Sequence, residues 1–280
     1  MPYSDPTPSG NAQAPLRSTD RFVDMLISEP EAWALFLDID GTLIDIAPSP
    51  DAIIVPADLP RRLQEVSDHL GGALALVTGR SLPYADKLFE PFSFPVAGLH
   101  GAERRMSDGT VGRVVATAAF EEVKDALTAA AGQWPGVLIE DKGAAVAAHY
   151  RQAPEWQGEV EKAMEFYLLQ AGPDFTLQRG KMVFEIRPAR ASKGSAVQDY
   201  LEEAPFKGRR PIAIGDDVTD EAMFRTVNML GGHSIRIAAE PGDTEAAEIF
   251  PSPEHLRQAL ARIAGGGEGP AASSQKGIIA

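Results

Sequence analysis

The stretch that most constrains the fold runs from Leu35 to Thr42 and reads Leu-Phe-Leu-Asp-Ile-Asp-Gly-Thr. Its leading apolar residues predict a buried strand. Side chains two positions apart on a strand point to the same side, so Asp38 and Asp40 would face one direction. Gly41 then lets the chain turn away. Open parallel sheets bind ligands at the carboxyl ends of their strands, and we expect both carboxylates at such an end.

The two acids allow a chemistry that a plain turn does not need. An aspartate is ionised at neutral pH and can attack an electrophile without a base. Two neighbouring carboxylates repel each other, which favours a shared proton or a divalent cation. The alternative is a strand that ends in a turn, because Asp and Gly are common turn residues. A bare Asp-x-Asp pair fits that alternative, whereas the Gly-Thr that follows makes the motif more specific.

Two further segments indicate that an anion binds near these acids. Residues 73–77 predict a second buried strand, and Thr78 and Gly79 follow it directly. A hydroxyl and backbone N–H groups at a strand end can hold phosphate oxygens, although Thr-Gly is also common loop chemistry. Lys193 opens a predicted helix, where a lysine opposes the helix dipole. Its position is better explained if an anion binds at the same place.

A fourth segment combines a strand with an unusual density of acids. Residues 211–214 predict the strand, and Gly-Asp-Asp-Val-Thr-Asp-Glu follows over 215–221. Acids are normal at a helix N-terminus, which accounts for Asp220. Asp216 and Asp217 directly end a buried strand, and there a bound cation is the better explanation.

The pattern changes between residues 116 and 185. Two segments with helical composition each precede a pair of short strands. This αββαββ order is self-contained, so we interpret the segment as an inserted α/β cap. The remaining ranges are a catalytic core, 21–115 and 186–264, and two flexible tails, 1–20 and 265–280.

In this order, the four segments resemble the motifs of the haloacid-dehalogenase-like phosphohydrolases. The resemblance implies an α/β fold with a Rossmann-like parallel-sheet core and an inserted cap. It implies that Asp38 is the nucleophile and Asp40 the general acid and base, and that Thr78, Gly79 and Lys193 bind phosphate. It also implies Mg²⁺ as the cofactor, held by the Asp38 carboxylate, the Asp40 carbonyl and Asp216. Asp217 and Asp220 would orient the metal's surroundings or Lys193.

Finer motifs resemble the trehalose-6-phosphate phosphatase family: Gly98-Leu99-His100-Gly101, Glu140-Asp141-Lys142-Gly143 and Glu185-Ile186-Arg187-Pro188. This resemblance implies hydrolysis of trehalose 6-phosphate through an aspartyl-phosphate. It implies that Glu140, Lys142 and Glu185 recognise sugar hydroxyls. Charges on short antiparallel strands are more simply a solvated face, and that alternative stays open. His100 could contact substrate, although a lone histidine after a strand is more often structural.

The same core chemistry permits other functions. One alternative is a phosphatase for another sugar phosphate, such as sucrose phosphate. A second is a sugar phosphotransferase, in which the acceptor is a sugar instead of water. A third is a regulatory subunit without catalysis, against which the presence of both Asp38 and Asp40 argues.

Composition excludes several other classes. With 26 basic and 40 acidic residues the net charge is −14, which argues against sequence-independent binding to nucleic acid or anionic membrane. Because the chain has no cysteine, it has no disulfides or thiolate metal sites. No apolar run approaches the about 18 residues of a membrane span, and no signal-peptide pattern opens the chain. We therefore expect a cytoplasmic protein.

The expected partner is a small sugar phosphate, with no nucleic acid and no membrane. The resemblance also implies a functional link to a separate trehalose-6-phosphate synthase. We expect no synthase domain within this chain, because only about 30 residues precede the first strand.

Overall fold

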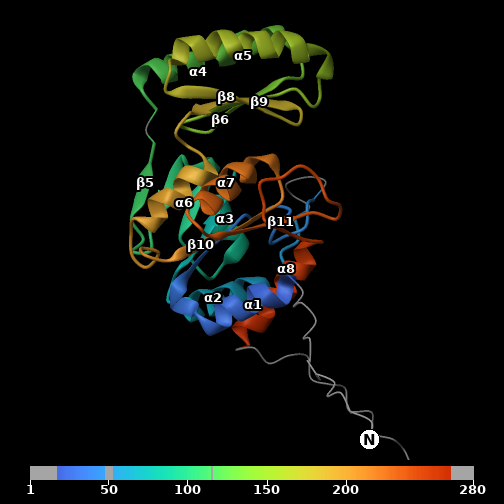
Figure 1. Cartoon of the computed structure of the whole chain (residues 1–280). Helices are drawn as coiled ribbons and strands as arrows, with labels where there is room; N and C mark the ends of the chain where they lie inside the picture. Colours follow the sequence, from blue (N-terminus) through green and yellow to red (C-terminus); the bar gives the residue numbers. More distant parts are fainter. Residues whose placement is uncertain (1–17, 48–52, 115, 266–280) are drawn as a thin grey trace, which may run out of the picture.

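The computed structural model describes residues 18–47, 53–114 and 116–265 (Figure 1). The sequence predicts tails over 1–20 and 265–280, and their residues 1–17 and 266–280 lie outside this range. The first helix, α1, spans Ser18–Ser28 and therefore includes residues 18–20, which the sequence interpretation gave to the N-terminal tail.

A large sheet forms the centre of one part of the molecule, in the order β12-β11-β10-β1-β2-β3-β4-β5. The first six strands in this order are parallel. β4 runs antiparallel to both of its neighbours, β3 and β5. β1 lies between β10 and β2, and all five of its residues are buried. This burial explains its continuous apolar sequence. The strand bounds are β1 Trp33–Leu37, β2 Leu74–Val77, β3 Val96–Gly98, β4 Glu103–Arg105, β5 Val111–Arg113, β10 Arg210–Gly215, β11 His233–Ile237 and β12 Glu248–Phe250.

Helices cover both faces of the large sheet. Along β1, Leu35 and Leu37 join a hydrophobic core with α1, α2, α3 and α8, whereas Ala34 and Phe36 join another with α6 and α7. This alternation follows from the period of two along a strand. The fold class predicted from the sequence is therefore confirmed. The helix bounds are α2 Leu59–His69, α3 Leu82–Phe89, α6 Lys193–Leu201, α7 Glu221–Met229 and α8 Pro253–Ala264.

A second, antiparallel sheet has the order β6-β7-β9-β8. Two helices, α4 and α5, cover one face and share a separate hydrophobic core with it. Figure 1 shows this sheet lying between its helices and the part that holds the large sheet. The element bounds are α4 Ala118–Ala130, β6 Leu138–Asp141, β7 Val146–His149, α5 Gln157–Ala171, β8 Phe175–Gly180 and β9 Val183–Pro188.

The order of these elements is the predicted αββαββ. β9 continues to Pro188, past residue 185, which the sequence interpretation gave as the end of the cap. The division into core and cap stays an interpretation, and we call the part around the second sheet the cap.

Candidate active site

The acids of the first and fourth motifs meet because β1 and β10 are parallel neighbours. Leu37 pairs with Ile214 in the register, so Asp38 and Asp216 leave the sheet side by side. Carboxylate oxygens of Asp38, Asp216 and Asp220 lie within 4.8 Å of one another. The sequence predicted this convergence, since the carboxyl ends of parallel strands share one edge.

Lys193 brings a cation to these acids from the start of α6. Its Nζ lies 2.6 Å from Asp38 Oδ1 and 2.6 Å from Asp220 Oδ1, and all three side chains are buried. Burial disfavours the ammonium, but the attraction of Asp38 and then Asp220 outweighs it and raises the pKa of Lys193. Lys193 therefore stays charged.

The acids carry more negative charge than Lys193 balances. Burial raises the pKa of Asp38 well above its usual range, and Lys193 opposes that shift. Burial, followed by repulsion from Asp220, raises the pKa of Asp216 to about 6. Three carboxylates therefore share one ammonium. A divalent cation would supply the missing positive charge, and carboxylate oxygens are ligands that Mg²⁺ prefers.

The backbone after Asp40 leaves room for the Asp216 carboxylate. A Cβ added at Gly41 would lie 2.2 Å from Asp216 Oδ2, and the φ of Gly41 is +77°. Only glycine suits both the conformation and the close approach. Thr42 Oγ1 donates a hydrogen bond to Asp216 Oδ1 over 3.3 Å. The Asp-Gly-Thr part of the motif therefore holds Asp216 in place, and this donor set fits Mg²⁺.

The Asp220 carboxylate holds the backbone of the acidic loop over residues 215–221. Its Oδ2 accepts hydrogen bonds from the backbone N–H groups of Asp216 and Asp217, each over 3.0 Å. Its Oδ1 accepts from Lys193. The contact to Lys193 is one of the two roles that the resemblance implied.

Arg80 is a site residue that the sequence reading did not identify. Its Nε and a terminal nitrogen donate to the two carboxylate oxygens of Asp40, over 2.8 and 2.9 Å. Its backbone N–H donates to Thr78 Oγ1 over 3.1 Å. A two-point contact fixes the orientation of a carboxylate. The signal in the sequence was an arginine directly after Thr78-Gly79.

One cleft of about 320 Å³ brings most of the predicted core residues together. Thr78 is buried and does not line it. The lining residues are Asp38, Asp40, Ile46, Gly79, His100, Lys193, Asp216, Asp217 and Thr219.

The predicted cap residues lie together on the face of the cap sheet away from its helices. Glu140 and Glu185 flank Ala147 on neighbouring strands, whereas Val146 and Ala148 enter the cap core. Lys142 Nζ donates to Glu185 Oε2 over 2.8 Å. Glu140 pairs with His149 over 2.8 Å. These residues do not line the cleft that holds the acids.

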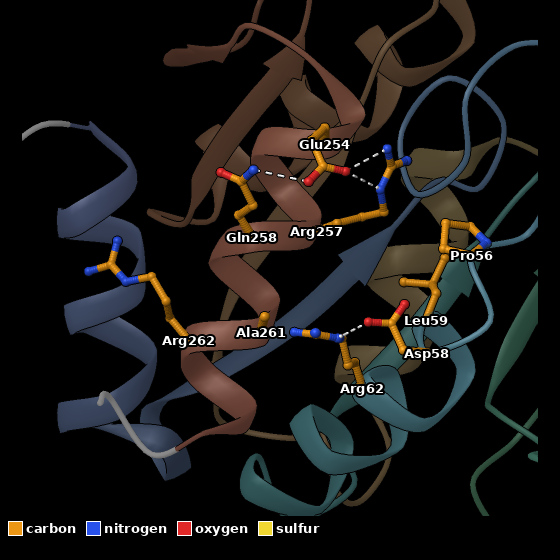
Figure 2. A pocket seen from close by; sticks show the side chains of 9 residues that line it. All are labelled: Pro56, Asp58, Leu59, Arg62, Glu254, Arg257, Gln258, Ala261 and Arg262. Atoms are coloured by element: carbon orange, nitrogen blue, oxygen red, sulfur yellow. Dashed lines mark hydrogen bonds and ion pairs between the residues drawn. The ribbon is translucent and has the colours of Figure 1, made fainter. Parts of the chain in front are cut away.

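A separate cavity of about 560 Å³ lies between α2 and α8 (Figure 2) and shares no lining residue with the cleft. Each of its arginines is paired with an acid: Arg62 with Asp58, Arg257 with Glu254 and Arg262 with Asp20. Arg257 also donates to the carbonyl of Leu43 over 3.1 Å. Because the arginines are already paired, this cavity offers a ligand no free positive charge.

A parallel sheet with Asp-x-Asp at the end of its central strand, a lysine on that aspartate and an acidic loop beside it defines the haloacid-dehalogenase-like phosphohydrolases. A solved phosphatase of this superfamily from Bacteroides thetaiotaomicron has a similar fold, with a TM-score of 0.59 and 17% identity. The match covers 91% of this chain and 99% of that one.

The trehalose-phosphatase family model matches residues 36–252. A probable trehalose-phosphate phosphatase of Sinorhizobium fredii is 61% identical over 243 residues, which cover 87% of this chain and 92% of the relative. The trehalose-6-phosphate phosphatase of Escherichia coli K12 is 42% identical over 222 residues, covering 79% and 82%. The chain belongs to the trehalose-phosphatase family, as its motifs predicted.

Proposed function

We propose that this chain hydrolyses trehalose 6-phosphate to trehalose and phosphate, with Asp38 as the nucleophile. The observation that carries the proposal is the buried Asp38 carboxylate, which lies in the cleft between Lys193 and Asp216. The 61% identity to a probable trehalose-phosphate phosphatase supports the substrate.

The proposed reaction has two steps. Lys193 occupies Oδ1 of Asp38, so Oδ2 attacks phosphorus and forms an aspartyl-phosphate as the bond to the sugar oxygen breaks. Asp40 enters this step in its protonated form and gives its proton to that oxygen, and trehalose leaves. Asp40 then takes a proton from the water that attacks the aspartyl-phosphate, which releases phosphate and restores Asp38.

The remaining core residues hold the phosphoryl group. Lys193 and the loop of Thr78 and Gly79 would contact its oxygens, where negative charge develops during transfer. Arg80 holds the ionised Asp40 carboxylate in one orientation, and this is the form that takes a proton from water in the second step. Mg²⁺, held by Asp38, Asp216 and the carbonyl of Asp40, would neutralise charge on the phosphate and on the acids.

The cap is proposed to recognise the sugar. Glu140, Lys142 and Glu185 share the face of the cap sheet away from its helices, and they offer acceptors and a donor for hydroxyl groups. Since they do not line the cleft, recognition requires the cap to approach the bound ester. Such closure would also exclude water from the first step.

A panel of sugar phosphates tests the substrate. Free phosphate is measured with trehalose 6-phosphate, sucrose 6-phosphate and glucose 6-phosphate, and kcat/KM should be highest for trehalose 6-phosphate. A higher value for another sugar phosphate would replace the proposed substrate and leave the core chemistry standing. A phosphotransferase would instead yield less free phosphate when a sugar acceptor is added, with a new sugar phosphate in its place.

Among the described residues, no helix is both long and apolar enough to cross a membrane. The cytoplasmic location and the functional link to a separate synthase stay predictions. Imaging of the tagged chain tests the first, and trehalose synthesis from the two purified enzymes tests the second.

A further inference from the structure

His100 lies in an unusual turn beside the cleft. Leu99, His100 and Gly101 have φ angles of +49°, +57° and +98°. Such left-handed conformations are unfavourable for residues with side chains, above all for a leucine. They persist where the surrounding structure holds them, and they concentrate at functional sites.

Two of the phosphate-site segments hold this turn. The backbone N–H of Leu99 donates to the carbonyl of Arg80, and that of His100 donates to the carbonyl of Thr78, each over 2.9 Å. On the other side, a Cβ added at Gly101 would lie 2.9 Å from the carbonyl oxygen of Ser192, which caps α6. The turn therefore fixes the imidazole relative to both the Thr78 loop and Lys193.

The imidazole packs on Gly79 and lines the cleft. A Cβ added at Gly79 would lie 2.8 Å from both Cε1 and Nε2 of the ring. Nδ1 is buried and has no hydrogen-bond partner within the described part of the chain. For comparison, the ring of His69 contacts the carbonyl of Leu26 over 3.0 Å, as expected for a structural histidine. A buried polar atom without a partner needs an explanation, and because the His100 ring lines the cleft, a ligand group that enters the cleft would supply one.

Positive groups from both parts of the molecule act on this ring. Burial, followed by Lys193 of the core and by Arg187 and Lys142 of the cap, lowers the pKa of His100 to about 3. The ring is therefore neutral, with one nitrogen that donates and one that accepts. A neutral ring adds no charge for a phosphate, but it suits a hydroxyl, which also donates and accepts.

We propose that His100 contacts a hydroxyl of the phosphorylated sugar next to the ester, and that it helps to select the sugar. This inference rests on the proposed phosphatase function. It places a recognition group in the core, where the phosphate site and the cap meet, in addition to those on the cap.

The test compares His100→Gly with His100→Asn, because glycine and asparagine both tolerate the observed φ. For trehalose 6-phosphate, kcat/KM of His100→Gly should fall about 10- to 100-fold, the loss of one buried hydrogen bond. Hydrolysis of p-nitrophenyl phosphate, which has no sugar hydroxyl, should fall several times less. The Asn amide lies close to the position of Nδ1 and should recover part of the loss.

Inhibition by products gives a second readout that a folding role would not produce. The inhibition constant for trehalose should rise in His100→Gly, and that for inorganic phosphate should rise much less. If His100→Gly does not fold, the same two comparisons in His100→Asn decide, with smaller changes of the same sign. His69→Asn is the matched control and should leave both substrate ratios as in the wild type.

Equal losses on both substrates, or no loss on either, would overturn the inference. The ratio is taken with whichever sugar phosphate the wild type hydrolyses best. A different best substrate would therefore refute the proposed function without deciding the role of His100. That role is decided by the loss on the best sugar phosphate relative to the loss on p-nitrophenyl phosphate.

Discussion

At the scale of single residues, the Lys193 ammonium pairs with two carboxylates at once. Lys193 contacts both Asp38 and Asp220, so a change in either acid alters the charge that the lysine experiences. The same lysine leaves one oxygen of Asp38 available for attack. The nucleophile can therefore be tested with a substitution that keeps its shape.

Asp38→Asn should lower kcat for trehalose 6-phosphate about a thousandfold or more, because an amide is a poor nucleophile. Circular dichroism and the melting temperature should show a folded protein. Asp125→Asn, an exposed acid on α4, is the matched control and should keep wild-type turnover. Phosphatase activity of Asp38→Asn equal to the wild type would rule out the aspartyl-phosphate.

Arg80→Lys should lower kcat about 10- to 100-fold, although the charge is kept. Lysine cannot reproduce the two-point contact that orients Asp40. Arg179→Lys, on the cap surface, provides the comparison, since Arg179 contacts Glu161 and Glu165 away from the cleft. A kcat for Arg80→Lys within twofold of the wild type would show that Asp40 does not depend on this contact.

At this scale the sequence indicated the acids, Thr78, Gly79 and Lys193, because each directly follows a predicted strand or opens a predicted helix. Arg80 escaped prediction for a physical reason. Its role depends on which carboxylate its long side chain reaches, and Asp40 lies 40 positions earlier in the chain. The unpaired Nδ1 of His100 likewise depends on packing that no local pattern encodes.

Among the elements, α6 is the helix that begins with Lys193, the residue proposed to bind phosphate. Ser192 and Ser195 form a capping box, in which each side chain bonds the other residue's backbone N–H. A well-formed N-cap fixes the first turn of a helix, and the N-cap of α6 fixes the position of Lys193. The stability of the protein and the proposed role of Lys193 are therefore linked at the N-cap of α6.

Ser192→Ala should destabilise the protein by about 0.5–2 kcal/mol, the usual cost of a lost N-cap. It should also lower kcat, because Lys193 loses its defined position. Ser252 is the N-cap of α8, where its side chain accepts from the N–H of His255. Ser252→Ala should cost similar stability in urea unfolding without a change in kcat. Equal kcat in both variants would show that the N-cap of α6 does not contribute to catalysis.

The polar residues on the cap sheet lead to a prediction about substrate choice. Lys142→Ala should lower kcat/KM for trehalose 6-phosphate about 5- to 150-fold, because the sugar would lose the proposed Lys142 donor and Glu185 would lose its partner. The loss with p-nitrophenyl phosphate should be several times smaller. Glu161→Ala is the control, since Glu161 is a half-buried acid of α5 that contacts Arg179. Equal losses on both substrates would assign Lys142 to cap folding or closure.

Most elements could be predicted from apolar runs, helical spacing and turn residues, including the αββαββ order. The helix α3 was missed because it has only eight residues and a proline at its second position. The strand β12 was missed because three residues are too few for a pattern, and its pairing with β11 supplies what its own sequence lacks. Tertiary contacts decide such short elements.

In the whole molecule, the excess negative charge at the cleft should make stability depend on Mg²⁺. A cation that binds only the folded protein stabilises it by about 2.7 kcal/mol at a concentration one hundred times its dissociation constant. The melting temperature should rise with Mg²⁺ and fall back with chelator, and phosphatase activity should follow it.

Asp216→Asn separates the metal from general salt effects. Burial and Asp220 raise the pKa of Asp216 to about 6. At neutral pH the carboxyl is still ionised in the folded protein, but its charge is less favourable there than in the unfolded chain, so it lowers stability. The variant should therefore melt higher than the wild type without Mg²⁺, and it should lose the Mg²⁺-dependent rise. A wild-type rise retained in Asp216→Asn would contradict this metal site.

The two sheets do not share a strand, and each has its own hydrophobic core. The groups proposed to act on phosphorus come from the large sheet and its helices, and most groups proposed to read the sugar come from the small one. A substitution on the small sheet can therefore alter which sugar is accepted while the ester chemistry persists. In an evolving lineage, the range of substrates can change through substitutions on the small sheet, while the reaction at phosphorus is inherited unchanged on the large one.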